Sequence, residues 1–168
     1  KAQNKLCDLM GNIAELDSAN SLLDIGSGLS SPALRWALSY PKIEISCVNI
    51  NYQQLQTAKN HLKERIPNFS IYEINSTSTM LPFSKNSVDR IIALESAQHF
   101  KPFKDFISES NRILKKDGVF TFAIPVTRKK SNIKNLGMLS FTWSSEHYDK
   151  DFIIDTTSKK FNVVEKME

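Results

Sequence analysis

The chain has 168 residues, of which 40% are hydrophobic and 24% charged, and its net charge is +4. This size and composition are typical of one globular domain with a full core, so we expect residues 1–168 to form a single domain. No apolar run approaches the roughly 20 residues of a membrane span, and the basic run at residues 128–134 is short, so neither a membrane nor a nucleic-acid partner is expected.

Apolar stretches of strand length alternate with amphipathic stretches of helix length along most of the chain. In chain order we expect a helix over 3–15, a strand over 21–25, a helix over 31–40, a strand over 43–50, a helix over 52–66, strands over 69–75 and 88–95, a helix over 102–116, a strand over 118–126, a weaker helix over 147–160 and a strand over 161–167. This alternation predicts a Rossmann-like, doubly wound α/β fold with a mainly parallel sheet and helices on both faces. In such a sheet, ligands bind at the carboxyl ends of the strands.

Segment 127–146 and the two cysteines indicate less about fold and function. Segment 127–146 is polar at first and then holds apolar residues without a clear period, which fits a loop folded over a site or a packed surface connection equally well. Cys7 and Cys47 are too few for a disulfide framework and lack the spacing of metal ligands. We therefore expect reduced thiols in a cytoplasmic protein, and no metal.

The stretch LLDIGSGLSS, residues 22–31, is the strongest functional signal. Gly26 and Gly28 directly follow an expected buried strand, where they permit positive φ and let a ligand approach the backbone. A purely structural tight turn would also explain them. A dinucleotide-binding turn needs a third glycine at position 31, which is serine here. Asp24 would repel a phosphate and suits a cationic ligand, which disfavours a nicotinamide-dependent reductase.

Taken with four later stretches, LLDIGSGLSSPALRWA resembles the class I S-adenosylmethionine-dependent methyltransferases, whose first motif is D-x-G-x-G-x-G. The nearest likeness is to the small-molecule enzymes that act on natural products, sterols, tocopherols and simple amines. The four stretches are CVNINYQQLQTAKNH, LPFSKNSVDRIIALESAQHF, FISESNRILKKDGVFTFAIP, which matches E-x-x-R-v-L-k-p-G-G, and FNVVEKME. The resemblance covers residues 20–168. It implies S-adenosylmethionine as cofactor, S-adenosylhomocysteine as product, no metal, and a small-molecule methyl acceptor.

The resemblance also assigns a cofactor site, residue by residue. Motif I would hold the methionine end of the cofactor, a strand end would hold the ribose, and the next loop would lie near the adenine. The residues at these positions are Asp24, Gly26, Ser27 and Gly28 for the methionine end, Asn49 with Ile50 for the ribose, Thr77 or Ser78 for the adenine, and Leu94 with Glu95 beneath the reactive sulfur. The strand context predicts that Glu95 is buried.

His99 follows Glu95 by four residues and is the candidate general base, since imidazole accepts protons near neutral pH. A packed or capping histidine is the alternative interpretation. Methyl transfer from a sulfonium releases a neutral thioether, so the leaving group needs little acid help, and the protein would mainly position donor and acceptor for in-line displacement.

Three departures from the family pattern keep other functions open. Ser30 stands where the third motif-I glycine is expected, and neither Asn49 nor Thr77 offers a carboxylate. The chain also stops after the strand expected at 161–167, where the family continues, so we expect a truncated domain. A degenerate domain that binds S-adenosylmethionine without catalysis is therefore the main alternative, and an RNA-modifying methyltransferase is a weaker one.

Overall fold

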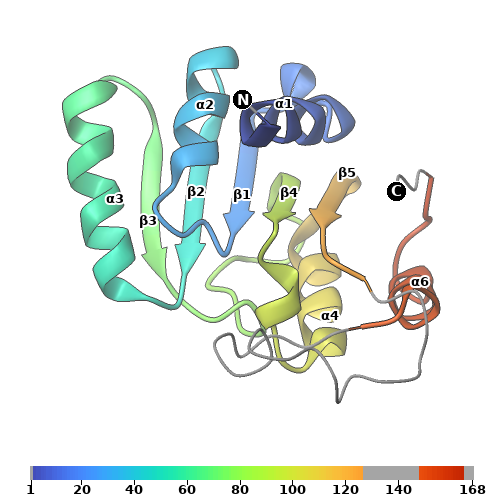
Figure 1. The fold of residues 1–168 in the computed structure, drawn as a ribbon. Coiled ribbons are helices and arrows are strands. Elements are labelled where there is room, and N and C mark those ends of the chain that lie inside the picture. Colours follow the sequence, from blue (N-terminus) through green and yellow to red (C-terminus); the bar gives the residue numbers. More distant parts are fainter. Residues whose placement is uncertain (1, 127–147, 165–168) are drawn as a thin grey trace.

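A computed structural model describes residues 2–126 and 148–164 (Figure 1). The elements are α1 (Ala2–Ile13), η1 (Leu16–Ser18), β1 (Ser21–Ile25), α2 (Ser31–Ser39), β2 (Glu44–Asn49), α3 (Tyr52–Arg65), β3 (Ile71–Asn75), β4 (Val88–Leu94), η2 (Ala97–His99), α4 (Phe103–Ile113), β5 (Leu114–Ala123) and α6 (Lys150–Ser158). None of the described helices is long and apolar enough to cross a membrane.

The strands form one five-stranded sheet in the order β3-β2-β1-β4-β5, and every pair is parallel. The chain first winds from β1 outward to β3 and then returns to β4, which pairs with the other side of β1. The winding direction therefore reverses between β1 and β4, and in open α/β sheets a ligand crevice forms at the carboxyl ends on either side of such a point.

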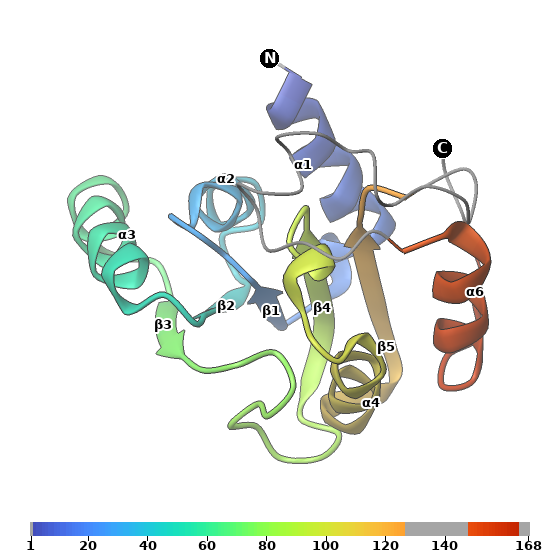
Figure 2. The ribbon, with the colours of Figure 1, turned by 60° about the horizontal axis from the view of Figure 1, so that its bottom comes forward.

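Helices cover both faces of this sheet, as Figure 2 shows, with α1, α2 and α3 on one side and α4 on the other. The first face packs against a core that contains Trp36, Leu22 and Ile45. The second face packs against α4 and α6, through a core in which Phe103 and Phe106 are fully buried. Alternate residues of β1 serve the two cores, since Leu22 belongs to the first and Leu23 to the second. The expected Rossmann-like, doubly wound fold is confirmed.

Most element boundaries lie within a few residues of the sequence prediction, and the largest differences around β5 have a structural reason. The helix expected over 102–116 ends at Ile113, and β5 already begins at Leu114. Leu114 pairs with Val88 before a register shift, and its side chain fills the space beside Gly118, so the Lys-Lys-Asp stretch belongs to an irregular strand start. The same strand ends at Ala123 rather than at 126, shortly before Pro125, which has no N–H to continue a ladder.

The prediction for the end of the chain is only partly testable. Residues 162–164 have no regular structure, so the strand expected over 161–167 is wrong for its described part. Phe161 instead packs against Phe120 of β5, at a ring-centroid distance of 5.0 Å. The weaker helix is confirmed as α6, which begins after Asp149, whose carboxylate accepts a bond from the N–H of Phe152. Segment 127–146 and the basic run at 128–134 lie outside the described residues.

Candidate functional site

The turn after β1 has the backbone that its glycines predicted. Gly26 and Gly28 have φ of 76° and 57°, which L side chains rarely adopt. The turn stays attached to β2, because the N–H groups of Gly26 and Ser27 both donate to the carbonyl of Val48, at 2.7 and 3.1 Å. The glycine turn thus leaves the sheet at the reversal point between β1 and β4.

The two glycines differ in what surrounds them. A Cβ on Gly26 would lie 2.5 Å from Cβ of Ser96 and 3.0 Å from Cζ of Phe100, so the protein itself fills that space. A Cβ on Gly28 would meet no described atom within 4 Å. Gly26 is therefore required by packing, whereas Gly28 leaves open space beside the turn.

Ser30 occupies the position of the missing third glycine and takes the glycine conformation. Its φ is 57° and its side chain is fully buried. A left-handed conformation costs an L residue about 1–2 kcal/mol. The turn accepts this cost without losing its shape, since the N–H of Ser30 donates to Ser27 and its carbonyl accepts the first helical bond of α2, from Leu34. The departure from the family motif changes a side chain and leaves the backbone path intact.

Asp24 is a buried acid at the base of the turn. Only 2% of its surface is exposed, and its Oδ2 has no hydrogen-bond partner among the described residues. Burial raises the pKa of this carboxyl from 3.8 to about 7. Its register neighbour on β2 is Cys47, whose thiol pKa is raised well above the usual value by burial and by the nearby Asp24. A carboxyl in this state would gain from a cationic partner.

Asn49, at the end of β2, holds the turn and the start of α3 together. Its Nδ2 donates to the carbonyl of Gly28 at 3.2 Å and to Oε1 of Gln54 at 2.8 Å, while its Oδ1 accepts from the N–H of Asn51 at 3.2 Å. A carboxylate at position 49 has no proton to donate to Gly28, which gives a physical reason for an amide here. Sequence reasoning missed Gln54, although the spacing Asn51-x-x-Gln54 is a helix-start pattern that would have drawn attention to it.

The ends of β2 and β3 bring the remaining cofactor candidates side by side. Nδ2 of Asn75 donates to the carbonyls of Asn49 and Ile50, both at 2.9 Å. Ile50 is exposed at this edge, Thr77 is half-buried and Ser78 is buried. The hydroxyl of Thr77 lies 3.1 Å from that of Thr79.

The end of β4 differs from expectation at one residue. Leu94 is half-buried as the last residue of the strand, but the predicted burial of Glu95 is wrong, because its side chain is exposed. Glu95 has a φ of 52°, so the chain turns sharply there and the side chain leaves the sheet. Next to it, the buried Ser96 hydroxyl donates to the carbonyl of Ile25 at 2.7 Å and joins the ends of β4 and β1.

His99 ends η2, directly beyond this junction, and its side chain is exposed. Its Nε2 lies 3.4 Å from Nε2 of Gln98, which donates to the carbonyl of Glu95 at 2.8 Å. The structure therefore brings His99 and Glu95 to the same strand end, with Gln98 between them. The role of His99 as general base stays a prediction.

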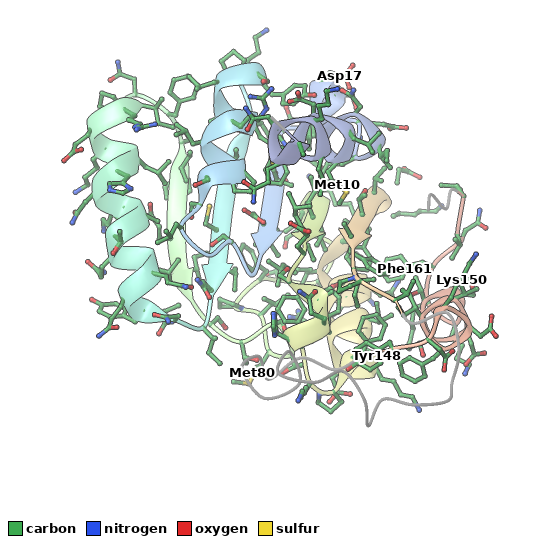
Figure 3. The ribbon with its side chains drawn as sticks, viewed as in Figure 1. Met10, Asp17, Met80, Tyr148, Lys150 and Phe161 are labelled. Carbon is green, nitrogen blue, oxygen red and sulfur yellow. The ribbon has the colours of Figure 1, made fainter. Side chains whose placement is uncertain are left out.

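A shallow hollow of about 360 Å³ lies just beyond His99, at the start of α4. Its lining residues are Lys101, Pro102, Phe103, Lys104, Tyr148 and Phe152. The rings of Tyr148 and Phe152 stack at 5.1 Å, and Phe103 lies 5.0 Å from Tyr148. Figure 3 shows both Tyr148 and Met80 below the edge of the sheet at which the strands have their carboxyl ends.

Metal binding remains open. Within residues 2–126 and 148–164, no three or more His, Cys, Asp or Glu side chains lie together in a group that could hold a metal ion. The expectation that the protein needs no metal stays a prediction.

Sequence comparison gives one family and several relatives. The family described as "Methyltransferase domain" matches residues 23–122, which is more than half of the chain. The erythromycin 3''-O-methyltransferase of Saccharopolyspora erythraea is 25% identical over 119 residues, which are 71% of this chain and 39% of that protein. The ubiquinone biosynthesis O-methyltransferase of Pelagibacter ubique is 33% identical over 105 residues, or 61% of this chain and 40% of that protein. The chain thus spans about two fifths of the length of these relatives.

Solved structures share the fold at lower identity. The [4+2]-cyclase SpnF superposes with a TM-score of 0.83 at 23% identity, covering 95% of this chain and 56% of that one. The geranyl diphosphate C-methyltransferase of Streptomyces coelicolor A3(2), solved with Mg²⁺, geranyl diphosphate and S-adenosyl-L-homocysteine, has a TM-score of 0.84 at 15% identity, covering 94% and 60%. At these identities the likeness concerns the fold alone.

Because the surroundings of the two glycines differ, the same substitution should affect ligand affinity at one position and protein stability at the other. Gly28→Ala should leave the protein folded and lower its affinity for S-adenosylhomocysteine at least about tenfold, because the new methyl group enters the open space. Gly26→Ala should lower the melting temperature sharply, because the methyl group meets Ser96. Thermal unfolding and calorimetric titration measure the two effects. Wild-type affinity in Gly28→Ala would contradict this assignment of the open space.

The raised pKa of Asp24 predicts how stability depends on pH. Between about pH 4 and pH 7 the folded protein keeps a proton that the unfolded chain has lost. The free energy of unfolding therefore falls as pH rises through this window, and the loss is complete once pH has passed about 7. Asp24→Asn should therefore stabilise the ligand-free protein, by about 2 kcal/mol more at pH 8.5 than at pH 5.5. Urea unfolding of both proteins at the two pH values measures the difference. An advantage that is the same at both pH values would refute the raised pKa.

Proposed function

The chain belongs to the methyltransferase-domain family, and from this premise we propose that it binds S-adenosylmethionine and transfers the methyl group to a small-molecule acceptor. One observation carries the proposal: the buried carboxyl of Asp24, whose Oδ2 has no hydrogen-bond partner among the described residues, lies at the base of a glycine turn that is open at Gly28. The carboxyl suits a ligand that is cationic at its methionine end, and the open turn gives that ligand access to the backbone. The expected product is S-adenosylhomocysteine.

The residues around the turn fit this cofactor. When bound, S-adenosylmethionine supplies an electrophilic methyl carbon attached to a sulfonium. Asp24, with the backbone of residues 26–28, would hold the methionine end, and the amides of Asn49 and Gln54 would face the ribose. The adenine of the cofactor would lie against the exposed Ile50, near Thr77 and Ser78. Leu94 and Glu95 would border the methyl group from the end of β4.

His99 would accept the proton of a hydroxyl or amine acceptor, because an exposed imidazole beside the reversal point is in reach of a molecule bound there. Most of the rate gain would come from holding acceptor and donor in line, which is worth up to about 7–11 kcal/mol. The aromatic hollow beyond His99 supports an acceptor with an apolar body. We do not propose a nucleic-acid substrate, since the RNA-modifying alternative rests only on an isoelectric point of about 9.0 and a short basic run at 128–134.

The degenerate, non-catalytic alternative is not favoured. It rested on Ser30 and on the missing carboxylates at positions 49 and 77, and two of these three positions have a local role in the fold. Ser30 keeps the backbone of the glycine it replaces, and Asn49 bonds to the turn itself. The cytoplasmic location also remains a proposal, supported by Cys7 and Cys47, which are both free thiols and buried.

Calorimetry with S-adenosylmethionine, S-adenosylhomocysteine and NADH tests the cofactor. Both adenosyl ligands should bind and NADH should not, because Asp24 lies where a dinucleotide would bring its phosphates. Binding of NADH alone would refute the proposal. Phenols, amines and sterol- or quinone-like acceptors can then be screened for transfer of a labelled methyl group.

On an acceptor found in this way, His99→Ala should lower turnover by about 10²–10⁴ and leave cofactor affinity nearly intact, because a general base acts in the transition state. His61→Ala is the matched control, because His61 is exposed on α3, far along the chain from this strand end. Full turnover in His99→Ala would mean that His99 only packs or orients, and would favour a carbon acceptor.

A further inference from the structure

The segment between β3 and β4 carries two cofactor candidates but has no helix or strand of its own. Residues 76–87 connect the two strands, and Thr77 and Ser78 lie near the start of the segment. Its internal bonds are local: for example, the Thr77 and Thr79 hydroxyls contact each other, the Ser76 hydroxyl donates to the carbonyl of Met80, and the N–H of Phe83 donates to the carbonyl of Leu81. Figure 2 shows the segment running from β3 to the side of α4. We call it the 76–87 loop.

One ion pair on α4 fixes the middle of this loop. Nε and Nη2 of Arg112 donate to the two carboxylate oxygens of Glu109, at 2.7 and 2.9 Å. The same guanidinium donates to two loop carbonyls, from Nη1 to Phe83 at 2.7 Å and from Nη2 to Leu81 at 3.0 Å. Glu109 completes the ring by accepting from the N–H of Leu81 at 2.9 Å. Both backbone polar groups of Leu81 are thus bound by one pair of side chains.

The surroundings make this pair more than a surface salt bridge. The Arg112 and Glu109 side chains are 36% and 19% exposed, and the Leu81 side chain is buried in the core. The guanidinium beside Glu109 lowers the pKa of that carboxyl, so the acid stays ionised in the folded protein. Charge-assisted bonds in a planar fork fix direction as well as distance. The anchored Leu81 is only three residues after Ser78.

We propose that Glu109 and Arg112 are positioning residues for the cofactor's base: by fixing the 76–87 loop at Leu81 and Phe83, they hold Thr77 and Ser78 against the adenine and set how selectively it is bound. This inference rests on the proposed function. It gives the E-x-x-R part of the sequence pattern a role in ligand recognition at a distance, without contact to the ligand. The pair touches neither cofactor nor acceptor, and it acts only through the loop.

The chain offers a matched control in Arg35, which forms a two-bond pair with Asp8 between α2 and α1. Arg35→Lys and Arg112→Lys both keep the charge and lose the planar fork, but only the second touches the loop. Glu109→Gln is a milder loop variant that keeps the shape of the side chain. For each protein, calorimetry gives the affinity for S-adenosylhomocysteine and for S-inosylhomocysteine, which differs only at the 6-position of the purine, and thermal unfolding reports the fold.

Arg112→Lys should bind S-adenosylhomocysteine about tenfold more weakly, the size of one lost hydrogen bond, and its preference for adenine over hypoxanthine should fall. Glu109→Gln should shift both quantities in the same direction by less, and Arg35→Lys should change neither by more than about twofold. A purely structural role would lower the melting temperature and leave the base preference unchanged.

The possible failures are distinguishable. If the unchanged protein binds neither ligand, the proposed function is wrong and this inference falls with it. If the unchanged protein binds S-adenosylhomocysteine but Arg112→Lys and Glu109→Gln retain its affinity and base preference, this inference alone is overturned. Equal weakening of both ligands would overturn it as well, because the loop would then not read the base. If Arg112→Lys does not fold, Glu109→Gln decides by the same criteria.

Discussion

The close approach of β1 and β4 at their carboxyl ends is the constraint from which the site is built. The buried hydroxyl of Ser96 reaches the carbonyl of Ile25, and the space it occupies leaves no room for a side chain at Gly26. Position 26 must therefore be glycine for packing, before any ligand is considered. The chain then leaves the sheet in a left-handed turn that has open space beside Gly28.

Much of this was accessible from the sequence, because the decisive signals are local. Strand-length apolar runs, the two glycines and Asp24 each depend on neighbours within a few residues, and the alternation of elements predicts a mainly parallel sheet with helices on both faces. The structure adds what depends on distant partners. Nothing in the sequence near Glu95 indicated a left-handed backbone, and the bond from Asn49 to Gly28 joins residues on different strands. The boundary between α4 and β5 was missed because Leu114 pairs with Val88, far earlier in the chain.

The departures from the family motif have local compensation in the folded protein. Serine at position 30 takes a conformation that glycine would take without strain, and an amide at position 49 replaces a charge by bonds to the turn and to Gln54. Removing the acid from the end of β2 leaves Asp24 as the buried carboxyl at this part of the sheet edge. Recognition of a cofactor here would then depend on one charge and several neutral amides, so a change in ionic strength should affect it little.

That single charge has a consequence for the energetics of binding. Near neutral pH a share of the molecules carries a proton on the Asp24 carboxyl, because burial raises its pKa to about 7. A cation that binds beside it favours the ionised form, so occupancy of the site releases protons to the medium. The heat of association then includes the ionisation enthalpy of whichever buffer takes up those protons. Two laboratories working at the same pH in phosphate and in Tris would obtain different enthalpies for one and the same equilibrium constant.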